Sequence, residues 1–71
     1  MGNNQRITFT DDELTLMLLY NPGSREGLLQ ELLKMQAQLS TDDSSLRSWT
    51  RSVLKKLRAM SDEEFDQLGL L

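Results

Sequence analysis

One helix-start pattern occurs twice in this chain, as Phe9-Thr10-Asp11-Asp12-Glu13-Leu14 and as Met60-Ser61-Asp62-Glu63-Glu64-Phe65. In each stretch a hydroxyl residue stands three positions before a Glu, which is the spacing of the reciprocal capping box. Carboxylates crowd both first turns, where unpaired backbone N–H groups and the positive end of the helix dipole stabilise negative charge. The two stretches therefore predict helix starts at Thr10 and Ser61.

This capping role accounts for six of the 11 acidic residues, namely Asp11, Asp12, Glu13, Asp62, Glu63 and Glu64. Metal-binding loops alternate their ligands around a glycine turn, and neither acidic cluster does so. The chain also has no Cys and no His, which excludes ordinary zinc sites and the nucleophile pairs that use these residues. We therefore expect no catalytic residue, no metal and no cofactor, and a protein that is not an enzyme.

The remaining start and stop signals divide the chain into four helices. Asn21-Pro22-Gly23 is a strong turn signal, Ser24 is placed to cap the next helix, and Ser40 or Thr41 to cap the third. The expected helices span about 11–20, 25–39, 43–60 and 62–68, with Gly69 placed to end the last and Leu70 to pack on it. The fold class expected is all-α, a compact bundle of three main helices plus a short C-terminal one. Residues 1–8 read as a loose leader and residues 9–71 as one helical domain.

Helical spacing of apolar residues predicts the core. One line is Leu28, Leu32, Met35 and Leu39, and the next is Leu46, Trp49, Val53, Leu57 and Met60. Aromatic residues are few, so we expect Trp49 and Phe65 near the centre of the core. Gly27 lies early in a helix, where close packing against another helix would explain it.

The helix over 11–20 is apolar nearly all round, which leaves two interpretations. If Leu14, Met17 and Leu18 face the core, then Leu16 and Leu19 point elsewhere. A helix of this kind is either central, wedged between the other three, or presents a patch that receives a partner helix or a second copy.

A second candidate surface is basic. At about 100° per residue, Arg47, Arg51, Lys55 and Arg58 fall within roughly 80° of one another on the helix over 43–60. They form either a solvated outer face or a docking surface for phosphates or an acidic protein. The net charge of −3 argues against general attraction to nucleic acid.

No apolar run is long enough for a signal peptide or a membrane span. These absences predict a cytoplasmic protein with no membrane partner, and we expect a monomer.

Three stretches resemble the transposon-transfer assisting protein family, small proteins of conjugative transposons in gut Firmicutes. They are Ile7-Thr8-Phe9-Thr10-Asp11-Asp12-Glu13-Leu14, the Leu-Tyr-Asn-Pro-Gly-Ser-Arg stretch at 19–25, and Leu54-Lys55-Lys56-Leu57-Arg58-Ala59-Met60-Ser61-Asp62-Glu63-Glu64-Phe65. The resemblance implies an accessory role in mobilising an integrated element and implies no catalytic residues.

We therefore expect a non-enzymatic adaptor that binds a protein of the transfer machinery. The candidate partner-binding residues are Leu16, Leu19, Arg47, Arg51, Lys55 and Arg58. The alternative is a weak DNA-binding accessory that uses the basic residues.

Overall fold

The computed structural model describes residues 7–69, which form four helices. These are α1 (Asp11–Tyr20), α2 (Arg25–Gln36), α3 (Ser44–Ala59) and α4 (Asp62–Asp66). No β-strand occurs in this part of the chain. The prediction of an all-α domain with three main helices and a short fourth one is confirmed. The predicted leader, residues 1–8, lies mostly outside the described residues, so the division into leader and domain stays a prediction.

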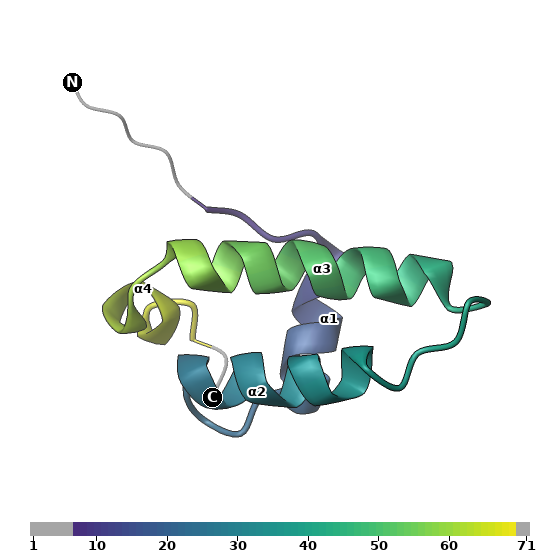
Figure 1. The fold of residues 1–71 in the computed structure, drawn as a ribbon. Helices are drawn as coiled ribbons and strands as arrows, with labels where there is room; N and C mark the ends of the chain where they lie inside the picture. Colours follow the sequence, from purple (N-terminus) through teal and green to yellow (C-terminus); the bar gives the residue numbers. More distant parts are fainter. Residues whose placement is uncertain (1–6, 70–71) are drawn as a thin grey trace.

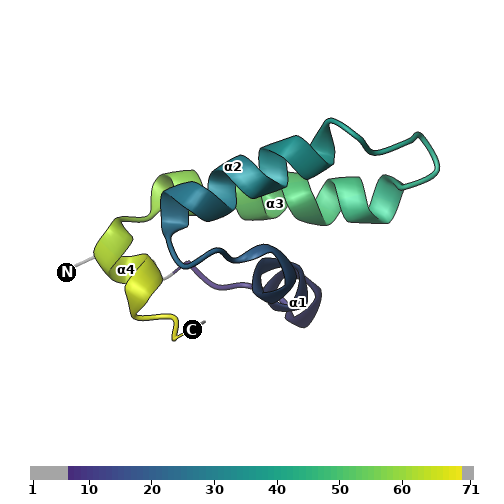
Figure 2. The same cartoon turned by 90° about the horizontal axis from the view of Figure 1, so that it is seen from below.

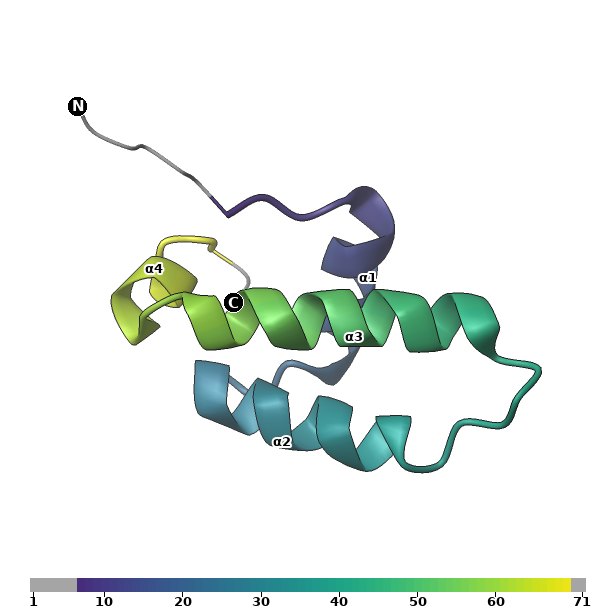
Figure 3. The ribbon, with the colours of Figure 1, turned by 45° about the horizontal axis from the view of Figure 1, so that its top comes forward.

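The helices form two layers. α2 and α3 lie side by side as a hairpin, and α1 crosses this pair steeply (Figure 1). Seen from below, α1 is viewed nearly along its axis and lies on the same side of the hairpin as α4 (Figure 2). Of the two interpretations of α1, the central one is wrong, because α1 packs against one side of the α2–α3 layer instead of being enclosed (Figure 3).

Three of the four helix starts follow the sequence signals. The Thr10 hydroxyl accepts from the Glu13 N–H at 3.2 Å, and the Thr10 N–H donates to the Glu13 carboxylate at 2.9 Å. In the same way, the Ser61 hydroxyl accepts from the Glu64 N–H at 3.1 Å, and the Ser61 N–H donates to the Glu64 carboxylate at 2.8 Å. The Ser24 hydroxyl accepts from the Gly27 N–H at 3.0 Å. Both predicted capping boxes and the predicted Ser24 cap are therefore confirmed.

The start of α3 differs from the prediction. Its N-cap residue is Asp43, not Ser40 or Thr41, and the Asp43 side chain makes no capping hydrogen bond. Instead the Asp43 carboxylate accepts from both the N–H and the hydroxyl of Ser40, each at 3.1 Å. These local bonds fold the preceding loop back on itself, which is a common alternative use of Asp and Ser near a helix start.

The ends of α2 and α4 come two or more residues earlier than predicted, because the last turns tighten. After α2, bonds of the i→i+3 type run from the N–H of Gln38 to the Met35 carbonyl and from Leu39 to Gln36. Residues 37 and 38 are thus turns, and residue 39 is also outside the helix. α4 ends at Asp66 in the same manner, two residues before the predicted end. Gly69 does adopt positive φ, at 68°; Leu70, expected to pack on this turn, lies outside the described residues.

The core is mostly aliphatic. Its fully or nearly fully buried apolar side chains are Leu16, Met17, Leu28, Leu32, Val53, Leu54, Leu57, Met60 and Phe65. Phe65 is 3% exposed, as predicted, whereas Trp49 is 37% exposed and does not belong to the core, so the prediction for Trp49 is wrong. The buried position next to it is taken by Thr50, whose hydroxyl donates to the Leu46 carbonyl at 2.7 Å. A back-bonded Thr buries its polar atom at little cost, while the bulky Trp rarely fits completely inside a small core.

Gly27 has a local explanation. A Cβ at this position would lie 2.7 Å from Pro22 Cγ and 2.8 Å from the Ser24 hydroxyl oxygen. The glycine is therefore required by the turn that precedes its own helix, and the expected close approach of another helix is not the reason.

Candidate functional site

The outer face of α1, which we define as Thr15, Leu18 and Leu19, points away from the hairpin. Leu18 is 57% exposed and Leu19 is 74% exposed. The expectation that Leu19 points away from the core agrees with this exposure. The expectations for the other two leucines are wrong, since Leu16 is 4% exposed and belongs to the core while Leu18 lies outside it.

The reason for this difference is the position of Glu13. Its side chain is buried beside Met17 on the inner side of α1, at 4% exposure of the whole residue. At about 100° per residue, burial of Glu13 and Met17 places Leu16 on the inner side and turns Leu18 outward. Apolar spacing alone could not reveal this rotation, because it depends on a charged residue that faces the core.

Glu13 is buried because Lys56 neutralises it. The Lys56 ammonium lies 2.6 Å from the Glu13 carboxylate, and the side chains are 29% and 5% exposed. Burial opposes ionisation of Glu13, but hydrogen bonds from Lys56, Ser52 and the Thr10 backbone outweigh it, so the pKa of the carboxyl lies below its usual 4.5. The Glu13 carboxylate is therefore charged and links α1 to α3 through its ion pair with Lys56. A general acid would need a raised pKa, whereas the pKa of Glu13 is lowered.

The basic face of α3, which we define as Arg51, Lys55 and Arg58, is exposed to solvent. Within residues 7–69 none of these three side chains makes a salt bridge. Arg47, predicted as a fourth member, is half-buried and donates to the Ser40 carbonyl at 2.7 Å. Arg47 thus closes the loop before α3, and the exposed cationic surface is one residue smaller than predicted.

The two candidate surfaces lie on opposite sides of the molecule. Lys56 reaches toward α1. Around the axis of α3, Arg51 and Arg58 lie roughly 140–160° from Lys56, and Lys55 lies about 100° from it. The basic face therefore points away from α1, while the outer face of α1 points away from α3. The structure does not bring the predicted apolar and basic residues into one site.

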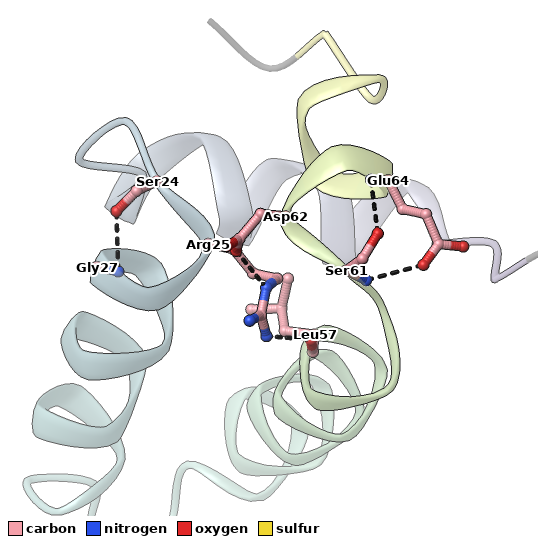
Figure 4. Close-up of polar contacts among 7 residues, drawn as sticks. All are labelled: Ser24, Arg25, Gly27, Leu57, Ser61, Asp62 and Glu64. Atoms are coloured by element: carbon pink, nitrogen blue, oxygen red, sulfur yellow. Dashed lines mark hydrogen bonds and ion pairs between the residues drawn. The ribbon is translucent and has the colours of Figure 1, made fainter.

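Sequence reasoning also missed a clasp that joins three helices. Arg25, at the start of α2, donates to the Leu57 carbonyl at 2.9 Å and to the Asp62 carboxylate at 2.8 Å (Figure 4). It thereby satisfies a carbonyl in the last turn of α3 and holds the start of α4. The sequence separations are 32 and 37 residues, and no local pattern signals contacts of this range.

Two observations on the described residues concern metal binding and pockets. No group of three or more acidic side chains among residues 7–69 is arranged to hold a metal ion. One hollow, of about 590 Å³, is open and is lined by Ile7, Thr8, Met60, Glu64, Gln67 and Leu68. Its single carboxylate, Glu64, is already engaged in the Ser61 capping box. In the same part of the chain, no helix combines the length and apolar character needed to cross a membrane.

These features define a small all-α domain with two exposed surfaces, one apolar and one basic, on opposite sides. Residues 9–71 match the family described as "putative transposon-transfer assisting protein", and the chain belongs to that family. This match confirms the resemblance seen in the capping stretches. Neither the curated proteins nor the solved structures give a match to this chain.

Proposed function

We propose that this protein is a non-enzymatic adaptor of a conjugative transposon and that it binds a protein of the transfer machinery. The family description supports an accessory role in transfer. The observation that carries the adaptor role is the exposure of Leu18 and Leu19 on the outer face of α1. Both are large aliphatic residues, and full burial of one such side chain contributes about 1.5–3 kcal/mol.

The exposure of these leucines is not required by the fold. α1 is already anchored by Leu16, Met17 and the Glu13–Lys56 ion pair on its inner side. Polar residues at positions 18 and 19 would serve the isolated domain equally well. Adjacent exposed leucines on one helix are typical of a surface that is covered by a partner.

Co-expression tests the adaptor role. The tagged full chain is expressed with the transfer proteins of its element, and captured proteins are identified by mass spectrometry. We expect capture of a transfer protein by the wild type and its loss with Leu19→Glu. Gln30→Glu is the matched control, since it adds the same charge at an exposed position of α2. Equal capture by Leu19→Glu and Gln30→Glu would contradict the role given to α1.

The basic face of α3 supports the second candidate function, weak DNA binding. Arg51, Lys55 and Arg58 are exposed at i, i+4 and i+7, and no acid lies between Ser44 and Met60. Three phosphate contacts would give a log–log salt slope near −3. NMR shifts on α3 with duplex DNA at low salt, lost at high salt and weakened by Arg51→Glu, are the expected signs. The absence of such shifts at low salt would rule this candidate out.

A further inference from the structure

Resting on the adaptor role proposed above, we propose that the outer face of α1 binds an amphipathic helix of the partner that carries basic residues where it lies beside Asp11 and Asp12. The family description does not give the chemistry of the partner. The order of side chains along α1 and the carboxylates there that form no salt bridge point to it.

The exposed side of α1 changes character along its length. Asp11 and Asp12 are exposed at its first turn, Thr15 is exposed in the middle, and Leu18 and Leu19 are exposed in the last turns. At 1.5 Å per residue the acidic and apolar ends are about 10–12 Å apart. A ligand that covers the leucines along the axis of α1 therefore also reaches the two carboxylates.

No cationic side chain among residues 7–69 pairs with the negative charge at this end, which is stabilised only by the helix dipole. Neither Asp11 nor Asp12 forms a salt bridge with any of residues 7–69. Lys56, the cation that reaches toward α1, is engaged with Glu13. An acidic partner would be repelled here, and a basic one would be attracted.

Neither α1 nor the basic face of α3 in a second copy of this chain has the required chemistry. Two α1 helices packed in parallel would place their aspartates together. An antiparallel pair would bring each acidic end to a helix C-terminus that carries no base and has a negative dipole. The basic face of α3 in another copy lacks a large exposed apolar side chain, since within residues 7–69 these are Leu18, Leu19, Leu33 and Trp49.

The binding mode follows from the backbone of α1. An extended peptide binds by adding to an exposed sheet edge, and residues 7–69 contain no strand. α1 offers side chains along a helical ridge, which a second helix can meet with its own apolar stripe at i, i+3 and i+4. The partner segment is thus a helix with leucine-like residues toward one end and Lys or Arg toward the other.

Peptide mapping tests this inference. Overlapping 25-residue peptides from the transfer proteins of the element are titrated into the full, ¹⁵N-labelled chain. We expect the peptides that shift the amide signals of residues 15–19 to be amphipathic and to carry a net positive charge. Asp12→Asn should weaken their binding by about tenfold and Leu19→Glu should abolish it, while Gln30→Glu leaves it unchanged. The spectra of the variants themselves report whether each one folds.

Three outcomes would overturn the inference. No peptide shifts the amide signals of residues 15–19, the peptides that shift these signals are acidic, or the shifts arise from self-association of the chain. Its failure is distinguishable from failure of the adaptor role. If a transfer protein is captured by Leu19→Glu but lost with Arg51→Glu, the adaptor role stands and the binding site is not α1. If basic amphipathic peptides bind α1 but no intact transfer protein is captured, the binding preference proposed for α1 is supported and the adaptor role is contradicted.

Discussion

The ammonium group of Lys56 lies 2.6 Å from the carboxylate of Glu13, which ties α1 to α3 across 43 residues of sequence. The same carboxylate oxygen accepts the Thr10 N–H, so that one group both caps α1 and anchors it. The Lys56 Nζ also lies 5.3 Å from the centre of the Phe9 ring, within the range of a cation–π contact. Glu64 occupies the equivalent position in the second capping box but is exposed. The same local motif therefore has a tertiary role at one end of the chain and a local role at the other.

Loss of this ion pair should destabilise the fold. Lys56→Met leaves the Glu13 carboxylate buried without its cation, and because Lys56 is partly exposed we expect a cost of about 1–3 kcal/mol, below the range for fully buried pairs. Lys55→Met is the matched control, since the adjacent Lys55 is exposed, and it should change stability by less than about 0.5 kcal/mol. Urea unfolding followed by the fluorescence of Trp49 measures both. Equal effects of the two substitutions would show that the ion pair contributes nothing.

The contribution of Glu13 should depend on pH. Its pKa lies below 4.5 in the folded protein, so the unfolded chain takes up a proton first as the pH falls. The stabilisation is therefore complete above pH 4.5 and is lost as the pH falls through the lower, folded-state pKa. The difference in urea midpoint between wild type and Glu13→Gln should shrink over this window. A difference that stays constant from pH 7 to pH 3 would contradict the assignment.

Gly27→Ala should destabilise the protein although alanine is the better helix former. The gain in helix propensity is about 1 kcal/mol, but the new methyl group would lie 2.7 Å from the Pro22 ring. Overpacking of this kind costs about 1–3 kcal/mol. Thermal unfolding of Gly27→Ala, of Pro22→Ala and of the double variant separates the gain in helix propensity from the cost of the contact with Pro22. Removal of the Pro22 ring should recover part of the loss; strictly additive effects would mean that the contact is not the cause.

The Arg25 clasp should depend more on its carbonyl bond than on its ion pair. Asp62 is 76% exposed, and exposed ion pairs contribute about 0–1 kcal/mol. The Leu57 carbonyl is part-buried, and its other donor, the Met60 N–H, is distant at 3.4 Å. We therefore expect Arg25→Met to cost about 1–2 kcal/mol and Asp62→Asn less than about 0.5 kcal/mol. The urea midpoints of the two variants compare the carbonyl hydrogen bond with the ion pair. A larger loss with Asp62→Asn would reverse this ranking.

The sequence predicts the local structure well because its signals are local. The start of α1 at Asp11, its end before Asn21-Pro22-Gly23 and both capping boxes depend on residues within one or two turns. Helix ends without a glycine or proline signal, such as that of α2 at Gln36, depend on how the last turn tightens. They are therefore less well defined by the sequence.

The faces of the helices were harder to predict. A helix that is apolar all round, such as α1, has no polar side to fix its rotation, and the buried charge of Glu13 set it instead. In α3, Trp49 and Thr50 both fit a helical apolar line, and the size of the core decided between them. Arg47 fits the basic stripe by spacing, but its bond to Ser40 depends on a loop conformation that spacing does not encode.

Leu16 and Leu19 therefore give a direct contrast on one helix. Leu16 is 4% exposed and Leu19 is 74% exposed. Leu16→Glu buries a charge in the core and should unfold the domain, while Leu19→Glu should stay within about 0.5 kcal/mol of wild type. Circular dichroism with thermal unfolding separates these outcomes. A folded Leu16→Glu variant would mean that α1 is rotated from its position in this structure.

The most direct measurement of the central claim is the affinity of the captured transfer protein for Leu19→Glu, determined by calorimetry beside the wild type and Gln30→Glu. We predict that Leu19→Glu remains folded and binds at least a hundredfold more weakly, while Gln30→Glu binds like the wild type. Unchanged affinity of a folded Leu19→Glu would contradict the claim that this protein works through the outer face of α1.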